Sequence, residues 1–380
     1  MQTNENDFNS ITNALHCKID TKEAYPVVTP LYQNSAFQAN SPYFYTRKDN
    51  PNCKEFENIV ATIEDAAFSI STTTGMAALN LVLSLLESGD RLVINKYVYG
   101  CSMKFFLRFA KKRKIELTIL DLSNDNEIDL IPKNVTMVIF ETPTNPFLKT
   151  INIADVTTKT KSLNKSALIV VDNTWATSLF QQPMKQGADI SLHSATKFFS
   201  GHSDVMGGII LTNNSLLSDK LRTERFYTGA ILDPHSAWLL CRSLQTFTLR
   251  MTEHQRVTKL MIPFLKKLPQ IKKVYMPEID GKQLVGYGGI IFFDLRDDLV
   301  QFYKEFSEAL SLFDTGTAMA CVTSMVAQPF SGSHASLSDS EKNKMGLGRG
   351  LIRLCFGLEN VNDLMNDIIL AFKTIETISE

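Results

Sequence analysis

The chain has 380 residues, a length that favours two or three domains. Its 44% hydrophobic and 21% charged residues are typical of globular proteins and argue against a disordered chain or a membrane protein. The 39 lysines and arginines almost cancel the 40 aspartates and glutamates, so net charge provides no attraction to nucleic acid or to an anionic membrane. We therefore expect a protein that handles a small molecule.

The cysteines and the first residues bear on redox state and location. The six cysteines are widely spaced and include no Cys-x-x-Cys pair, which predicts free thiols rather than a zinc or redox site. The first seven residues are polar and acidic, whereas a secretory signal has a basic start followed by an apolar stretch. No apolar run reaches the ~20 residues that a membrane-spanning helix needs. These features predict a cytoplasmic protein.

The first fifty residues contain Pro26, Pro30 and Pro42 and show few helical periods. Proline removes a backbone donor and interrupts helices, so an extended arm is predicted over residues 1–50. Arms of this kind often pack on another copy of the chain. We expect this one to reach a neighbouring subunit.

A short strand, a turn and a helix are predicted between residues 66 and 86. The turn reads Thr-Thr-Thr-Gly-Met over residues 72–76, and the helix is expected to begin near Gly75. A helix N-terminus offers free N–H groups to a phosphate, and glycine permits close approach. Many helices begin with a threonine cap, so this segment alone is weak evidence for a phosphate site.

Strands and helices continue to alternate after this unit. Strands are predicted at residues 91–94, 116–120, 135–140 and 167–171, with a helix at residues 102–112. The last of these strands is almost wholly apolar, which is typical of a buried parallel strand. The alternation predicts an α/β fold, with a large and mostly parallel sheet in a domain of residues 51–250.

The pattern changes after a long helical stretch at residues 236–267. Apolar strands are predicted at residues 289–293 and 351–356, and they enclose helical segments. This arrangement predicts a smaller α+β domain over residues 251–380.

Asp172 and Lys197 are the first candidates for chemistry. Asp172 directly follows an apolar strand, at the edge of the sheet where open α/β folds bind ligands. A carboxylate there can keep a pyridinium nitrogen protonated, although an aspartate after a strand is more often a turn or capping residue. Lys197 lies between Thr196 and Phe198, and an apolar setting favours the neutral amine that forms Schiff bases. As a lone feature, a lysine beside phenylalanine is usually a surface residue.

Arg353 lies in a strand whose other members, at residues 351–356, are apolar. Its guanidinium is therefore expected to be mostly buried, and a buried guanidinium needs an anionic partner. Either an internal carboxylate or an anionic ligand would serve. His193, His202 and Asp204 lie close in sequence but lack the spacing of zinc ligands, so no metal site is predicted.

Taken together, these segments resemble the Cys/Met-metabolism family of pyridoxal-phosphate enzymes. The family includes cystathionine γ-synthase, cystathionine γ-lyase, cystathionine β-lyase and methionine γ-lyase. The likeness extends over residues 28–359, and its most specific block comprises residues 171–174, 187–190, 193–197 and 201–204. The resemblance implies fold type I of the pyridoxal-phosphate-dependent transferases, with a seven-stranded sheet and pyridoxal 5'-phosphate as cofactor.

The resemblance also implies roles for individual residues. Lys197 would hold the cofactor as a Schiff base and later carry protons, Asp172 would pair with the ring nitrogen, and Tyr99 would stack on the ring and assist the leaving group. The other implied cofactor-binding residues are Gly75, Met76, Asn145, Thr174, Ser194 and Thr196, with Tyr45 and Arg47 reaching the phosphate of the adjacent subunit. The implied substrate-binding residues are Arg353, for the α-carboxylate of an amino acid, with Tyr45, Thr317, Ala318 and Cys101.

A site completed by Tyr45 and Arg47 of another subunit would be shared between two chains. Members of the family are typically tetramers built from such dimers, so the resemblance implies a homotetramer with shared active sites.

The expected reaction is γ-elimination or γ-replacement on a homoserine-derived or sulfur amino acid, such as O-acylhomoserine, cystathionine or methionine. Family members that make or cleave cystathionine often carry Glu-Ser where this chain has Thr317-Ala318, and Cys101 is similar to a cysteine of methionine γ-lyases. The alternatives are β-elimination from cystathionine or cysteine, and an unusual secondary-metabolic substrate. A non-catalytic protein on the same fold is a third, against which the retention of Lys197, Asp172 and Arg353 argues.

Overall fold

The computed structural model describes residues 25–316 and 318–379. Much of the predicted arm, residues 1–24, and the predicted substrate residue Thr317 lie outside the described part. The chain divides into two units, residues 1–31 and 32–380, which are considered separately. The described residues of the first unit, 25–31, contain no helix or strand.

The larger sheet of the second unit has seven strands in the order β1-β7-β6-β5-β4-β2-β3. Their bounds are β1 (Phe68–Thr72), β2 (Arg91–Asn95), β3 (Glu116–Leu120), β4 (Met137–Glu141), β5 (Leu168–Asp172), β6 (Ile190–His193) and β7 (Gly208–Thr212). β7 runs antiparallel to β1 and β6, and the other neighbours are parallel. The predicted large, mostly parallel sheet is confirmed.

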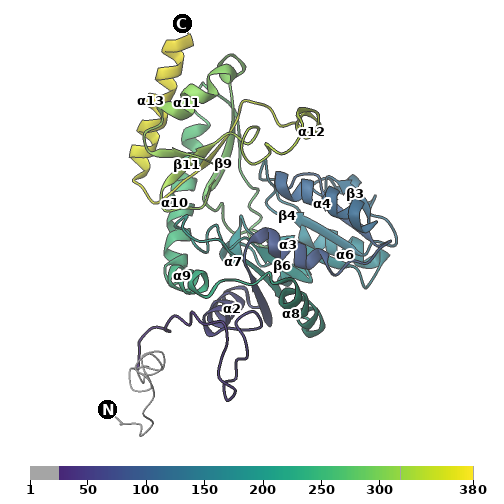
Figure 1. Ribbon diagram of the computed structural model, residues 1–380. Helices are drawn as coiled ribbons and strands as arrows, with labels where there is room; N and C mark the ends of the chain where they lie inside the picture. The colour runs from purple at the N-terminus through teal and green to yellow at the C-terminus, as the bar shows by residue number, and fades with distance from the viewer. Residues whose placement is uncertain (1–24, 317, 380) are drawn as a thin grey trace. The chain divides into compact units, whose positions relative to one another are not determined.

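The central strands are apolar because both of their faces are covered. In β4, Met137 and Ile139 belong to one core cluster, whereas Val138 and Phe140 belong to another on the opposite face. The accompanying helices are α2 (Pro51–Glu64), α3 (Gly75–Leu83), α4 (Gly100–Arg113), α5 (Asp125–Ile128), α6 (Ile153–Leu163), α7 (Thr177–Phe180), the 3-10 helix η1 (Pro183–Gln186) and α8 (Ser215–Thr228). α3 packs on β1, β6 and β7, so its first residues come to the edge of the sheet (Figure 1).

The smaller sheet has five strands in the order β10-β11-β12-β9-β8. They are β8 (Ile271–Tyr275), β9 (Ile290–Leu295), β10 (Phe313–Thr315), β11 (Ser324–Ala327) and β12 (Leu351–Cys355). α9 (Pro234–Leu244) packs on α2, and its buried apolar residues belong to the core of the larger sheet. The helices of this half are α10 (Phe247–Leu265), the 3-10 helix η2 (Asp297–Phe302), α11 (Tyr303–Ala309), α12 (Asp339–Lys344) and α13 (Val361–Ser379). Figure 1 shows α10 and α13 beside β9, where they bury a core of their own.

Two features of this half differ from the sequence prediction. The helical stretch predicted over residues 236–267 is two helices, because the chain leaves the helical conformation at Thr246, which precedes α10 with φ −107° and ψ 8°. Strands β8, β10 and β11 were not predicted. β8 carries the exposed Lys272 and Lys273, and β10 has three residues, so neither shows a long apolar pattern.

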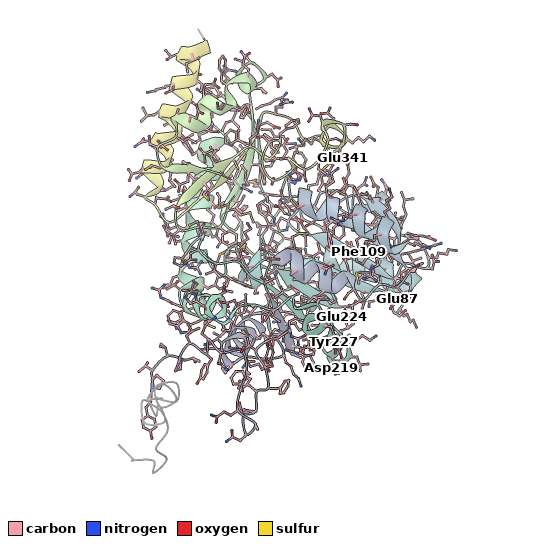
Figure 2. All side chains as sticks on the ribbon, viewed as in Figure 1. Glu87, Phe109, Asp219, Glu224, Tyr227 and Glu341 are labelled. Atoms are coloured by element: carbon pink, nitrogen blue, oxygen red, sulfur yellow. The ribbon has the colours of Figure 1, made fainter. Side chains whose placement is uncertain are left out.

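An ion pair links helix α4, which accompanies the larger sheet, to helix α12 of the other half. Lys104 of α4 lies 2.9 Å from Glu341 of α12, labelled in Figure 2. Glu341 also accepts the N–H of Ser338, whose hydroxyl caps the first turn of α12. This contact places α12 next to α4. Among the described residues, no helix combines the length and apolar character needed to span a membrane.

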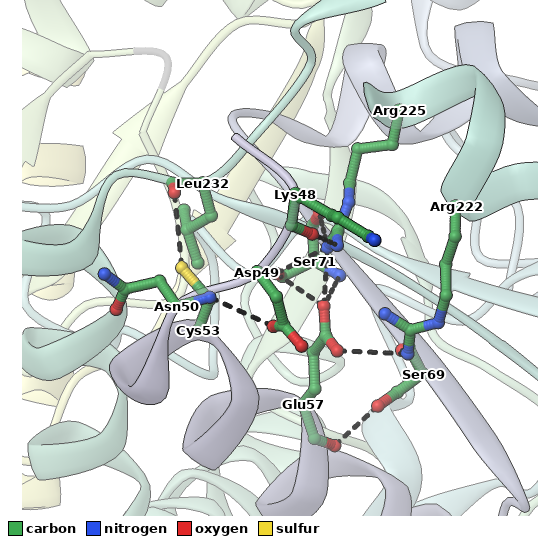
Figure 3. Close-up of polar contacts among 10 residues, drawn as sticks. All are labelled: Lys48, Asp49, Asn50, Cys53, Glu57, Ser69, Ser71, Arg222, Arg225 and Leu232. Carbon is green, nitrogen blue, oxygen red and sulfur yellow. Dashed lines mark hydrogen bonds and ion pairs between the residues drawn. The ribbon is translucent and has the colours of Figure 1, made fainter. Parts of the chain in front are cut away.

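A buried ionic cluster supports the segment that carries Tyr45 and Arg47. Glu57 of α2 is 1% exposed and lies 2.6 Å from Arg225 and 3.1 Å from Arg222, both on α8. Figure 3 shows this cluster, in which Arg225 also donates a hydrogen bond to the carbonyl of Lys48 at 3.1 Å. The cluster therefore fixes the backbone directly after Arg47.

Replacing Arg225 by alanine is expected to lower the free energy of unfolding by about 3–5 kcal/mol, because it leaves Glu57 as a buried charge short of its main partner. Urea unfolding of both proteins measures the difference. The matched control is Arg296→Ala, which removes an exposed pair with Asp298 and should cost no more than about 1 kcal/mol. Similar losses for the two variants would contradict the assignment.

The same cluster has a defined pH dependence. Burial by itself raises the pKa of Glu57, but Arg225, Arg222 and Ser71 outweigh burial, and the pKa lies below its ordinary value of 4.5. A carboxylate with a lowered folded pKa contributes stability above its unfolded pKa and loses it as the pH falls through the folded one. The gap between native protein and Arg225→Ala should be largest near neutral pH, where Glu57 is charged in both proteins, and should shrink as acid protonates Glu57, first in the variant, where fewer partners oppose the effect of burial.

Candidate active site

A cavity of about 460 Å³ lies where several strands of the large sheet end. Its lining includes residues that follow or end β1, β2, β4, β5 and β6, at the edge where α/β sheets bind ligands. The residues predicted from the sequence that line it are Gly75, Met76, Tyr99, Asn145, Asp172, Thr174, Ser194, Thr196, Lys197, Ala318 and Arg353. Most of the predicted site therefore converges on one cavity.

Three of the predicted residues that the structure describes are not in this lining. Tyr45 and Arg47 lie outside it, and Arg47 instead stacks at 4.3 Å on the ring of Phe226 and donates to the Phe226 carbonyl at 3.1 Å. The exposed Cys101 also lies outside the lining, but its side chain is hydrogen-bonded to Tyr99. The roles of all three stay predictions.

Lys197 follows β6 in a tight turn. Its N–H donates to the carbonyl of Ser194 at 3.1 Å, and its carbonyl accepts the N–H of Gly201 at 2.7 Å. Burial lowers the pKa of the Lys197 amine, and the positive charge of Arg353 lowers it further. Both effects favour the neutral amine, which is the nucleophilic form.

Asp172 is the last residue of β5, and its carboxylate is held by Thr174. The N–H of Thr174 donates to Asp172 Oδ1 at 3.0 Å, and the Thr174 hydroxyl donates to the same atom. Burial raises the pKa of Asp172, while Thr174 and His193 act in the opposite direction. A partly buried, oriented carboxyl group of this kind suits a protonated ring nitrogen.

The beginning of α3 suits a phosphate. Thr74 caps the helix by accepting the N–H of Ala77 at 3.0 Å, and the first N–H groups of any α-helix have no partner within the helix. A Cβ atom added at Gly75 would lie 2.8 Å from Cβ of Ser194, so this close approach requires glycine. The turn before α3 and the Ser194 segment therefore meet at one end of the cavity.

Arg353 of β12 reaches the cavity from the smaller sheet. The side chain is 2% exposed, as the apolar strand predicted. Its Nη2 donates to the carbonyl of Ala318 at 2.8 Å, and Nη1 lies 3.8 Å from Sδ of Met319. Burial lowers the pKa of this guanidinium. The Ala318 carbonyl thus orients the Arg353 guanidinium, whose planar N–H donors can bind a carboxylate.

Tyr99 stands just before α4. Its N–H donates to Oε1 of Glu141 at 2.7 Å. Burial, together with the hydrogen bond to Cys101, raises the pKa of the phenol to about 12, so the hydroxyl stays protonated at neutral pH. Glu141, Trp175 and Met319 also line the cavity but were not predicted from the sequence. For Glu141 a signal existed, because it ends an apolar strand as Asp172 does.

These groups fit pyridoxal 5'-phosphate. An amine with a lowered pKa, a partly buried carboxylate and a helix N-terminus border one cavity, and they match the aldehyde, ring nitrogen and phosphate of that cofactor. Asn145 is 4% exposed, and its Oδ1 has no hydrogen-bond partner among the described residues, so a polar atom in the cavity remains available for a bound group. The fold and site therefore define a pyridoxal-phosphate-dependent enzyme of fold type I.

Comparisons with known proteins narrow this class to a family. Residues 11–373 match the model of the Cys/Met metabolism PLP-dependent enzymes. Cystathionine beta-lyase of Lactococcus lactis subsp. cremoris (strain MG1363) is 35% identical and L-methionine gamma-lyase of Fusobacterium nucleatum subsp. polymorphum is 34% identical. The alignments cover 94% of this chain in both cases, and 97% and 96% of those proteins. The structure of cystathionine gamma synthase from Xanthomonas oryzae pv. oryzae has a TM-score of 0.89 and 31% identity, covering 98% of this chain and all of that one.

The chain belongs to the family of Cys/Met metabolism PLP-dependent enzymes, as the resemblance of its motifs predicted. It is an enzyme whose cofactor is pyridoxal 5'-phosphate. The alternative of a non-catalytic protein on the same fold is set aside.

Proposed function

We propose that the protein catalyses γ-elimination or γ-replacement on a sulfur-containing or homoserine-derived amino acid. The observation that carries the proposal is that Lys197, Asp172 and Arg353 line one cavity, so an amine, a ring-nitrogen partner and a carboxylate receptor are available together. The named activities of the relatives support this substrate class, since they act on cystathionine or methionine by name.

Each residue has a defined task in this proposal. Bound pyridoxal 5'-phosphate supplies an electron sink for charge that develops at the substrate α-carbon. Arg353 binds the substrate α-carboxylate and so orients the Cα–H bond. Lys197 removes the Cα proton and returns it at a neighbouring atom as a general base and acid. Asp172 holds the proton on the ring nitrogen, and the phenol of Tyr99 assists the leaving group.

The second candidate is β-elimination, which the cystathionine beta-lyase relative favours. Steady-state assays with O-acylhomoserine, methionine, cystathionine and cysteine separate the reactions. Release of 2-oxobutanoate, or a γ-replacement product with an added thiol, would support the proposal. Pyruvate as the main product from cystathionine or cysteine would favour β-elimination. A cofactor-loaded enzyme inactive on all four would contradict both and favour an unusual secondary-metabolic substrate.

We further propose a cytoplasmic homotetramer of two dimers, with each active site completed by Tyr45 and Arg47 of a neighbouring copy. Support comes from the position of these residues, since both lie outside the cavity of their own chain and Arg47 is held against the ring of Phe226. The planar guanidinium of Arg47, held in place by stacking on Phe226, is suited to bind the phosphate of a cofactor in another subunit. We also propose that an N-terminal arm precedes two domains, which comprise residues 51–250 and 251–380.

Mixing two inactive variants tests the shared site. Lys197→Ala and Arg47→Ala are each expected to be strongly impaired, whereas mixed subunits should regain about a quarter of native activity, because half the dimers are mixed and one of their two sites is intact. The control mixture is Lys197→Ala with Arg353→Ala, whose mixed dimers contain no intact site. No recovery in the first mixture, after subunit exchange is verified, would contradict a site shared between chains.

A further inference from the structure

Glu141 is an acidic residue of the cavity to which the proposed reaction assigns no task. It is the last residue of β4, it is 5% exposed, and it lines the cavity. β4 and β5 are parallel neighbours in which Glu141 is paired with Asp172. Two residues earlier the pair is Ile139 and Val170, and both belong to the core cluster on the face covered by α3. Side chains alternate along a strand, so both carboxyl groups point to that same face.

The two carboxyl groups have unequal hydrogen-bond support. Asp172 accepts from both the N–H and the hydroxyl of Thr174. Glu141 accepts one hydrogen bond, from the N–H of Tyr99 to Oε1, and its Oε2 has no hydrogen-bond partner among the described residues. Neighbouring carboxylates that are shielded from water repel each other, so the more deeply buried Glu141, which also has fewer donors, holds a proton more readily.

We infer that Glu141 is a positioning residue that acts as a neutral acid. Its Oε1 holds Tyr99 at the cavity, while its protonated state leaves Asp172 as the single anion at the ring-nitrogen end. Burial raises the pKa of Glu141 well above its ordinary value, and the Asp172 charge adds to this. The inference rests on the proposed function, because it concerns groups that act on the bound cofactor.

Neutrality at this position has a consequence for Lys197. A second carboxylate in the same cavity would favour the charged ammonium form of Lys197, against the effects of burial and of Arg353. It would also place two anions opposite one protonated ring nitrogen. A proton on Glu141 therefore favours the neutral form of the Lys197 amine. It also leaves Asp172 as the single anion paired with the protonated ring nitrogen.

Two substitutions separate the parts of this inference. Glu141→Gln keeps an oxygen acceptor for Tyr99 and is neutral, so we expect cofactor affinity within about threefold of native, and the pH midpoint of the bound cofactor's visible absorption within about 0.5 units. Glu141→Ala removes the acceptor, and we expect about tenfold weaker cofactor binding, as for one lost hydrogen bond. Fluorescence titration of protein stripped of cofactor measures both affinities.

Inorganic phosphate and a control variant test whether the loss is specific. Inorganic phosphate is expected to bind at the N-terminus of α3 and not at Glu141, so its affinity should change less than about twofold in Glu141→Ala. The matched control is Glu127→Ala, which removes a similar bond, from the N–H of Asp121 at 2.7 Å, outside the cavity lining. It should bind the cofactor as the native protein does.

The neutrality of Glu141, its positioning role and the proposed function are each contradicted by a different result. A midpoint shift of about one unit or more in Glu141→Gln would show that native Glu141 is charged and would overturn its neutrality. An equal loss of phosphate and cofactor affinity in Glu141→Ala would show a general structural effect and overturn the positioning role. Failure of the native protein to take up pyridoxal 5'-phosphate would instead overturn the proposed function, and with it this inference.

Discussion

Replacing Lys197 by alanine is expected to lower kcat/KM by about a thousandfold or more, since it removes both the nucleophile and the proton carrier. The side chain projects from a turn fixed by backbone hydrogen bonds to Ser194 and Gly201, which the substitution retains. The loss should therefore occur with little change in the melting temperature. Steady-state kinetics on the preferred substrate, with circular dichroism on the same samples, measure both quantities.

The matched control is Lys185→Ala, a lysine of η1 that pairs with Asp65 at the surface. It should retain native activity. Borohydride treatment of the native enzyme should attach the cofactor to the peptide that contains Lys197, and the label should be absent from Lys197→Ala. Retention of more than about a tenth of native activity by Lys197→Ala would contradict the role assigned to this amine.

Replacing Arg353 by alanine is expected to lower kcat/KM by about 30-fold to a few thousandfold, because truncating one partner of a buried charge pair costs about 2–5 kcal/mol. The substrate carboxylate would lose its receptor, so KM should rise together with any fall in kcat. Arg353→Lys should recover part of the loss, since an ammonium retains the charge but not the planar fork. Kinetics with a full range of substrate concentrations separate the two parameters.

Cofactor affinity distinguishes this role from a structural one. Arg353 is proposed to bind substrate, so Arg353→Ala should hold pyridoxal 5'-phosphate within about threefold of native. Arg296→Ala, which removes an exposed arginine paired with Asp298, serves as control and should leave KM unchanged. An unaltered KM in Arg353→Ala, or a loss of cofactor equal to the loss of activity, would contradict carboxylate binding.

Local patterns were sufficient for much of the fold. The run before Asp172 is apolar and β-branched, as a strand buried on both faces must be, and it forms β5. The turn at residues 72–76 leads into α3, which begins at Gly75 as predicted. The prediction missed an interruption without a strong local signal, at Thr246, and was incomplete for short or partly exposed strands such as β10.

In the site, too, some residues have a clear local signal in the sequence and others do not. Lys197, Asp172 and Arg353 were recognisable because each combines an ionisable group with apolar neighbours along the chain, and a charge in such a setting needs a partner. Glu141 has the same local setting as Asp172 but was overlooked. Its environment depends on its pairing with Asp172 across β4 and β5, and on a hydrogen bond from Tyr99.

From the sequence alone, apolar periodicity and turn residues determined the α/β architecture, because they are properties of neighbouring residues. The cofactor class and most of the cavity residues came from the resemblance of the motifs to a known family. Only the tertiary structure decided which groups share one cavity and which carboxyl groups are neighbours. Strand order and register bring Glu141 beside Asp172. The folded chain also places the Arg353 guanidinium within hydrogen-bonding distance of the Ala318 carbonyl. Protonation states follow from burial and from charges at a distance of a few ångströms, and those exist only once the chain has folded.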